Sequence, residues 1–328
     1  MKLLVPIMIT AVWGCQAVAQ SVEDACAAAA EEPQLVWYSS QDPSRNAAAA
    51  EAFSHAYPQV AIEHLRLATG ALATRYAQER DAGVINADLI SLADPNFIAQ
   101  GMANEWFVPL TADTLPRLAE LDPAWINHGA VTSSLSMLGF AYNSEAVGET
   151  PPATWEDLLD PRYAGQIIMG DPRSVPSYMA LFRILRDELG EDYLTRLAAQ
   201  QPVVVPSVVP ATQQLAAGEV SIVVPNVMTV VRVLSEQGAP IAFVAPDLTT
   251  GNEFETVISA GADSPNAALC FLSFLMSEEG QTAYNGATSV SPFPGTPGTA
   301  PMPANYIAPR IMEVDDHAAQ INGLLGLD

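Results

Sequence analysis

The sequence predicts an α/β fold, because short apolar segments typical of buried strands alternate with helical segments along most of the chain. The first such unit has a strand at residues 34–38, a helix at 45–57 and a second strand at 60–65. Two parallel strands joined through a helix form a right-handed crossover. Small polar turns follow the strands, and open α/β sheets bind their ligands at the carboxyl ends of strands. The pattern therefore predicts both the fold class and the sheet edge that carries a site.

An export signal precedes this unit. Lys2 is followed by an apolar run at residues 3–12 and by the A-x-A sequence of residues 17–19, which predicts cleavage after Ala19. The apolar run is too short to span a bilayer as a helix. A lipid anchor at Cys15 is the alternative, although the bulky Trp13 fits poorly just before such a cysteine. Both alternatives predict an exported protein.

The composition limits the classes of partner. A chain of 328 residues with 49% hydrophobic residues can fill one large or two medium domains. Its 37 acidic residues outnumber 13 basic ones, for a formal net charge of −24. This balance excludes a nucleic-acid-binding surface and disfavours contact with anionic membranes. The acidic residues are spread along the chain, as expected of a solvated surface.

Cysteine and histidine usage predicts neither a metal site nor an enzyme. Cys26 and Cys270 remain after cleavage, and in an oxidising compartment such a pair favours a disulfide; two buried free thiols are the alternative. The four histidines are scattered, and the chain has no zinc-binding H-E-x-x-H, no G-x-S-x-G elbow and no phosphate-binding P-loop. We therefore expect a non-enzymatic protein without a cofactor.

Three turns of the first half are candidate ligand contacts. Ser39 and Ser40 follow the first strand, and Thr69 with Gly70 opens a helix whose backbone amides could hold an anion. Asp94 follows the third strand, where a helix cap is the more usual role. Serine and threonine at such positions can also serve only as caps.

The stretch at residues 142–177 is the most informative part of the chain. Thr154 is a good N-cap for a short helix at 155–159, and proline at 161 ends that helix. A buried strand follows at 166–169, and its polar turn contains Arg173 and Ser174 ahead of a helix at 177–189. The other predicted elements are strands at 88–92, 203–205, 220–224 and 240–243, and helices at 22–30, 72–81, 191–199, 211–217, 265–276, 278–285 and 308–321.

This stretch resembles the periplasmic solute-binding proteins of ABC importers, in the type II group that includes ferric-ion, phosphonate, thiamine and sugar-phosphate binders. The shared pattern is Y-N-x-x-x-V, then W-x-D-L-L-D-P-x-Y-x-G and a later D-P-x-S. The resemblance implies a monomeric, two-lobed periplasmic protein with two mixed or parallel sheets flanked by helices. It also implies a two-stranded hinge, closure on a small solute, and delivery to an inner-membrane permease.

The resemblance also divides the chain. The signal peptide is residues 1–19, the first lobe 20–132 plus 256–300, and the second lobe 133–255 plus 301–328. The crossover at 131–143 then brings Ser133 or Ser134 to the cleft, and Asn226 ends a second-lobe strand. A second crossover at 254–260 returns to the first lobe.

The ligand class depends on the positions after Asn226. Ferric binders of this group carry two adjacent tyrosines there and a histidine after the first strand. This chain has Val227 and Met228 instead of the tyrosines, and Gln41-Asp42 after the first strand. These side chains do not supply the anionic oxygen ligands that ferric ion prefers. Direct iron binding in that manner is therefore doubtful.

Arginine in the cleft predicts an anionic solute. Arg173 can bind a carboxylate or phosphate bidentately, although it could instead pair with Asp171. Arg232 and Arg66 are further candidates. We therefore predict a small organic anion, a phosphorylated or phosphonated compound or a dicarboxylate. The alternatives are ferric iron or an iron chelate, and a sensor that presents its ligand to a membrane receptor.

Overall fold

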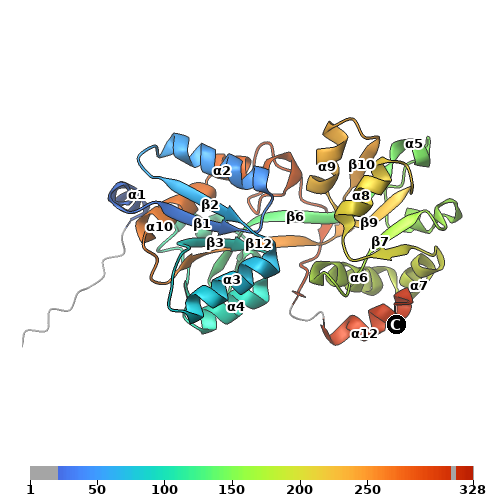
Figure 1. Cartoon of the computed structure of the whole chain (residues 1–328), viewed down its shortest axis with the longest axis horizontal. Helices are drawn as coiled ribbons and strands as arrows, with labels where there is room; N and C mark the ends of the chain where they lie inside the picture. Colours follow the sequence, from blue (N-terminus) through green and yellow to red (C-terminus); the bar gives the residue numbers. More distant parts are fainter. Residues whose placement is uncertain (1–20, 312–314, 328) are drawn as a thin grey trace, which may run out of the picture.

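The computed structural model describes residues 21–311 and 315–327. The predicted signal peptide, its cleavage at Ala19 and the alternative anchor at Cys15 lie outside the described residues. The described part forms two α/β lobes joined by extended strands (Figure 1).

The first lobe is a sheet in the order β2-β1-β3-β12-β6. Its parallel strands are β1 (Leu35–Ser39), β2 (Ile62–Arg66) and β3 (Leu89–Leu92), and β12 (Gly251–Ser259) runs antiparallel to β3. Trp37 and Tyr38 are neighbours on β1 and lie in different apolar clusters, because alternate residues of a strand face opposite sides of the sheet. The other elements of this lobe are α1 (Val22–Ala28), α2 (Pro43–Ala56), α3 (Thr69–Asp81), α4 (Pro95–Ala103), α10 (Pro265–Leu275), α11 (Glu278–Asn285), β4 (Phe107–Val108) and β5 (Ile126–Asn127).

The second lobe continues the order as β6-β9-β7-β8, with β10 on the same long strand β6. Its strands are β7 (Ile167–Gly170), β8 (Val203–Val205), β9 (Ile222–Val227) and β10 (Ile241–Val244). Its helices are α5 (Ser144–Val147), α6 (Pro176–Leu189), α7 (Glu191–Ala199), α8 (Val208–Ala216) and α9 (Met228–Glu236). One large apolar cluster fills this lobe and contains Trp155 and Phe182.

The 14-residue strand β6 (Ala130–Asn143) joins the lobes. Its first half pairs with β12, and its second half pairs with β9 and β10 (Figure 1). β12 in turn connects the second lobe back to β3, so two long strands form the hinge. The predicted two-lobed fold with a two-stranded hinge is confirmed.

The last part of the chain differs from the prediction. The sequence predicts a helix at 308–321, but residues 308–310 are not helical; among the described residues that follow, a one-turn 3-10 helix at Asp315–His317 leads into the helix α12 (Ala318–Leu325). The short strand β13 (Asn305–Tyr306) precedes this segment. Pro309 explains part of the error, because the residue before a proline is disfavoured in a helix. α12 packs against α6 and α7 of the second lobe.

Other element boundaries differ by a few residues. α3 begins at Thr69, so Thr69 and Gly70 lie within its first turn rather than before it. The segment expected as a helix at 155–159 is a 3-10 helix, Glu156–Leu159. The capping expected there is present, because Thr154 Oγ1 accepts from Asp157 N and the Asp157 carboxylate accepts from Thr154 N.

Cys26 and Cys270 form the predicted disulfide, which ties α1 to α10. Glu32 strengthens the same junction, because its carboxylate accepts hydrogen bonds from the backbone amides of Asn266 and Ala267 at the start of α10.

Gly139 lies where β6 passes β10, and a Cβ atom there would overlap the backbone carbonyl oxygen of Val244. We expect Gly139→Ala to lower the free energy of unfolding by about 3 kcal/mol, because the strand cannot move away without breaking its ladder. Gly70→Ala is the matched control, since a Cβ at position 70 meets nothing within 4 Å. Urea unfolding of both variants tests this, and equal stability of the two would contradict it.

Candidate functional site: the interlobe cleft

A cleft of about 600 Å³ opens between the lobes, beside the hinge. Its walls come from strand-to-helix turns of both lobes and from β12. The lining residues are Ser40, Thr69, Gly70, Ala93, Asp94 and Asn96 of the first lobe; Asn252 and Phe254 of β12; Ser174, Val175, Pro176, Ser177, Tyr178, Val208, Val209, Val227 and Val230 of the second lobe; and Ile311.

Five helices begin at this cleft: α3, α4, α6, α8 and α9 each contribute first-turn or N-cap residues to its lining. Asp94 caps α4 by accepting from Phe97 N at 3.0 Å. Among the described residues, no side chain caps the other four helices. Apart from the prolines at 176 and 210 and the Tyr178 amide, which donates to Val175 O, the first-turn amides of these helices lie at the positive ends of the helix dipoles. These dipole ends favour negative charge at the cleft even though the chain is acidic.

Ser40 adds a hydroxyl group to the cleft wall. The residue is 7% exposed, lines the cleft, and its Oγ has no hydrogen-bond partner within residues 21–311 and 315–327. Ser39 does not line the cleft. Its Oγ donates to Asn46 Oδ1 at 2.9 Å and accepts from Gln41 N, so it braces the turn before α2. Ser39, predicted as a contact, therefore has a structural role in this turn and lies outside the cleft lining.

Ser133 and Asn226 are also absent from the lining. Ser133 is fully buried in the hinge and is hydrogen-bonded to Phe254 O and to Thr256 Oγ1, the latter at 2.7 Å. Asn226 is fully buried, donates to Thr212 Oγ1 at 2.9 Å and accepts from Val227 N. Both satisfy their polar groups inside the protein. The structure therefore places them behind the cleft wall, in positions that fix β6, β9 and α8.

Arg173 lies beside the cleft rather than in it. It lines a neighbouring hollow of about 380 Å³, which shares Asn96, Pro176 and Ile311 with the cleft. Its guanidinium is held by the Asp171 carboxylate at 2.9 Å, and its Nη1 donates to Leu327 O at 2.6 Å. Hydrogen bonding to Arg173 lowers the pKa of Asp171. The pairing with Asp171, considered as the alternative, is the contact observed.

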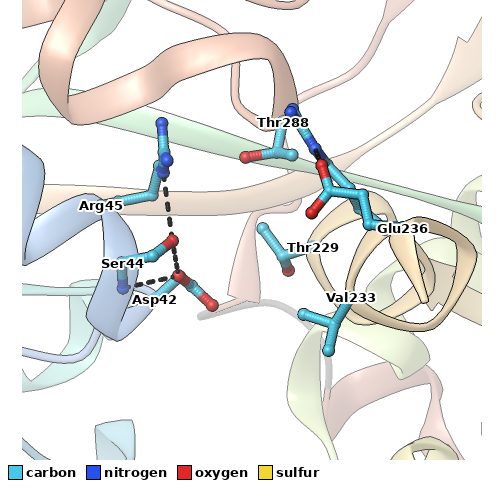
Figure 2. Close-up of a pocket in the computed structure, with 8 residues that line it drawn as sticks. Asp42, Ser44, Arg45, Thr229, Val233, Glu236 and Thr288 are labelled. Carbon is cyan, nitrogen blue, oxygen red and sulfur yellow. Dashed lines mark hydrogen bonds and ion pairs between the residues drawn. The ribbon is translucent and has the colours of Figure 1, made fainter.

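The other two candidate arginines also lie elsewhere. Arg66 Nε donates to the Gln41 carbonyl, and Arg232 pairs with Glu236 one turn along α9. Arg232 lines a separate hollow of about 220 Å³, in which residues of α2 face residues of α9. Figure 2 shows Asp42, Ser44 and Arg45 on one side of this hollow and Thr229, Val233 and Glu236 on the other. The structure thus brings together Ser40, Thr69, Gly70 and Ser174 of the eight predicted contacts.

Residues 84–310 match the family model of the bacterial extracellular solute-binding proteins. The chain belongs to this family. It is a family of binding proteins rather than enzymes, as predicted from the lack of catalytic motifs in the sequence. In the described part of the chain, no helix is long and apolar enough to cross a membrane.

Solved structures with the same fold share little sequence with this solute-binding protein. The substrate-binding protein of an ABC transporter from Agrobacterium tumefaciens is 20% identical, with a TM-score of 0.71 over 90% of this chain and 96% of that one. Iron-bound HitA from Pseudomonas aeruginosa is 19% identical, with a TM-score of 0.68 over 89% and 99%. The periplasmic binding protein AfuA from Actinobacillus pleuropneumoniae, with exogenous fructose 6-phosphate bound, is 22% identical, with a TM-score of 0.63 over 89% and 98%.

A curated relative covers less of the chain. An uncharacterized protein of Haemophilus influenzae is 30% identical over 164 residues, which is 47% of each chain. The match therefore spans about half the length of that relative.

The structure adds cleft residues that the sequence did not single out. Asn252 and Phe254 enter from β12, and Ser177 and Tyr178 enter from the first turn of α6. Burial raises the pKa of Tyr178 to about 12, so its phenol is neutral at physiological pH. Ser177 and Tyr178 follow Ser174 within one turn, a spacing from which they could have been predicted.

The donor set of the solute-binding protein does not favour ferric ion. Tyr178 is the only tyrosine among the cleft residues, and Val227, one of the two positions where the resemblance to ferric binders would imply a tyrosine, lines the cleft as an apolar side chain. No group of three or more histidine, cysteine or acidic side chains that could hold a metal occurs within the described ranges. A neutral phenol and a capping Asp94 are poor replacements for several anionic oxygen ligands.

The opposite side of β12 carries two carboxyl groups. Glu255 is 1% exposed, and burial together with the nearby Glu253 raises its pKa to about 8. Burial also raises the pKa of Glu253, whose Oε1 accepts from the Tyr306 hydroxyl. Asp94, His128 and Arg310 are the other ionisable residues around this pair.

Glu255 is expected to make the protein less stable at high pH. Its folded-state pKa lies above its ordinary value, so the folded protein keeps this carboxyl group protonated at pH values where the unfolded chain ionises it. The resulting contribution to stability is fully present below pH 4.5 and is lost as the pH rises through about 8. We expect the stability of Glu255→Gln minus that of wild type to rise by about 2 kcal/mol between pH 5 and pH 8, roughly half the free-energy equivalent of the full pKa difference. Urea unfolding at both pH values tests this. A difference that does not change with pH would contradict it.

Proposed function

We propose that this protein is the periplasmic substrate-binding component of an ABC transporter. It captures a small organic anion, carrying a phosphate, phosphonate or carboxylate group, in the interlobe cleft and delivers it to an inner-membrane permease. Family membership supports the transport role. The observation that carries the anionic ligand is the convergence of five helix N-termini on one cleft, four of them without a side-chain cap among the described residues.

Helix N-termini bind anions because their first-turn amides are free to donate and because the helix dipole favours negative charge. Each such end contributes about 0.3–1 kcal/mol at exposed positions and up to about 2 kcal/mol when partly buried. Several ends acting on one group can therefore replace the arginine that the sequence suggested. The unpartnered Ser40 hydroxyl supplies a further donor at the same wall.

The rest of the cleft favours an organic skeleton over a bare inorganic anion. Val208, Val209, Val227 and Val230 form an apolar stretch of wall, and Phe254 adds an aromatic face. Small-molecule sites commonly combine such apolar lining with a few placed polar groups. Asn252 and Ser177 offer polar contacts to hydroxyl or amide groups of the same ligand.

A thermal-shift panel on the mature, ligand-stripped protein tests the proposal. The panel contains sugar phosphates, phosphonates and dicarboxylates, with inorganic phosphate, putrescine, thiamine, and ferric ion with and without citrate for comparison. A ligand at 100 times its dissociation constant stabilises the folded state by about 2.7 kcal/mol. For a protein of this size we expect the melting temperature to rise by about 5–10 °C with one organic anion. A shift produced only by ferric ion, or only by an amine, would contradict the proposal.

A further inference from the structure

Strand β12 separates two cavities. Asn252 and Phe254 line the interlobe cleft, whereas Glu253 and Glu255 line a hollow of about 240 Å³ on the other face. This division follows from the period of two in a strand. The hollow also has Asn127 and His128 beside the end of β5 and Ala308–Ile311 of the C-terminal segment as walls.

Glu255 has an unsatisfied group in this hollow. The side chain is 1% exposed and lines the hollow, and its Oε2 has no hydrogen-bond partner among the residues that the structure describes. An unpaired buried carboxyl oxygen is costly, because a buried polar group needs a partner to replace water. Glu253 supplies a second carboxyl group on the same strand face, and its Oε1 accepts from the Tyr306 hydroxyl.

The other polar groups of the hollow limit the ligand. Asn127 is close enough to Glu255 to lower its pKa by hydrogen bonding, and Asp94 adds negative potential from the direction of the cleft. Arg310 is an exposed residue at the rim and brings positive charge, as His128 does when protonated. No triad of potential metal ligands occurs in the described ranges, which argues against a metal ion. The hollow is also smaller than the pockets that hold drug-sized ligands.

We propose that this hollow is a second binding site, for a small organic cation with N–H donors, and that Glu255 anchors it. An alkylammonium group has the required charge and donates to the unpartnered Oε2, and the nearby Glu253 carboxyl group adds negative potential at the same site. The apolar walls provided by Pro95, Ala124 and Ala308 cover a short alkyl chain.

The proposal predicts proton release on binding. Glu255 is largely protonated at neutral pH and must ionise to pair with the cation. The affinity should therefore rise about tenfold for each pH unit between pH 6 and pH 7, and level off above pH 8.

Isothermal titration calorimetry of the mature protein with n-butylammonium chloride tests the site, in two buffers of different ionisation enthalpy. We expect binding with release of about one proton. Tetramethylammonium has the same charge without N–H donors and should bind at least about tenfold more weakly. Calcium chloride is the metal comparison. Tight calcium binding that depends on Glu255 would assign the hollow to a metal ion and overturn the proposal.

Three variants complete the test. Glu255→Gln keeps the shape and should abolish both the butylammonium signal and its pH dependence, whereas Glu279→Gln, at an exposed position on α11, should change neither. Cooperative melting of each variant establishes that it is folded. Unchanged binding in Glu255→Gln would overturn the proposal. Binding seen only in Arg310→Gln would also overturn it, because the chain's own guanidinium would then be the occupant.

Discussion

Gly70→Asp is expected to weaken binding of an organic anion by at least about 100-fold, while Gly70→Asn weakens it by less than about tenfold. Gly70 lies in the first turn of α3 and lines the cleft, and a Cβ atom there meets nothing within 4 Å. The new side chain therefore enters the cleft without disturbing the fold. Two like charges about 4 Å apart at an effective dielectric constant of about 20 repel by about 4 kcal/mol, which exceeds the 2.7 kcal/mol of a 100-fold change.

The two substitutions form a matched pair, because aspartate and asparagine have nearly the same shape and differ in charge. Calorimetric titration with the anion identified by thermal shift measures both affinities. Stability should not fall, since an acidic residue in the first turn of a helix is favourable by about 0.3–1 kcal/mol. Equal losses of affinity in both variants would mean that the new side chains block the ligand sterically and that the ligand carries no charge near position 70. Tighter binding in Gly70→Asp would show that the ligand is a cation.

The four predicted contact residues that line the cleft could each be recognised from their immediate neighbours in the sequence. Ser40 and Ser174 lie in turns after strands, and Thr69 with Gly70 opens a helix after another. A strand-to-helix turn is recognisable from a few neighbouring residues, and the parallel sheet then brings such turns to one edge. The fold could be predicted for the same reason, because alternating periodicities need no knowledge of distant contacts.

The predicted contact residues that do not line the cleft are placed by distant contacts or by side-chain direction. Ser39 is the last residue of β1 and Ser40 is the first residue after it, so which of the two side chains reaches the cleft depends on where the sheet ends the strand. Arg173 is held in part by the carbonyl of Leu327, a residue 154 positions later. Val208 and Val227 are apolar residues of the kind that fill a protein core, and only the arrangement of α8 and α9 places them at the cleft wall. None of these side-chain placements can be predicted from a short stretch of neighbouring residues.

The double variant Cys26→Ala, Cys270→Ala is expected to lower the free energy of unfolding by about 3–5 kcal/mol. The disulfide closes a loop with a sequence separation of 244 residues. In the chain-entropy model, a loop of this length restricts the unfolded state by about 5 kcal/mol, and measured values usually fall below the model. Both cysteines are buried between α1 and α10, so the alanines also leave a small cavity there.

Urea unfolding of the oxidised wild type and the double variant measures this loss, and the wild type under reducing conditions provides a comparison without the change of side chain. We expect the reduced wild type and the double variant to agree within about 1 kcal/mol, since the cavity effect of two small side chains is modest. α1 should remain docked in both, because Glu32 still accepts the amides of Asn266 and Ala267 and caps α10. The additional variant Glu32→Gln should therefore cost more in the double variant than in the oxidised wild type. A loss below about 1 kcal/mol on removing the disulfide would show that these contacts alone restrict the N-terminal segment, and that the covalent link contributes little.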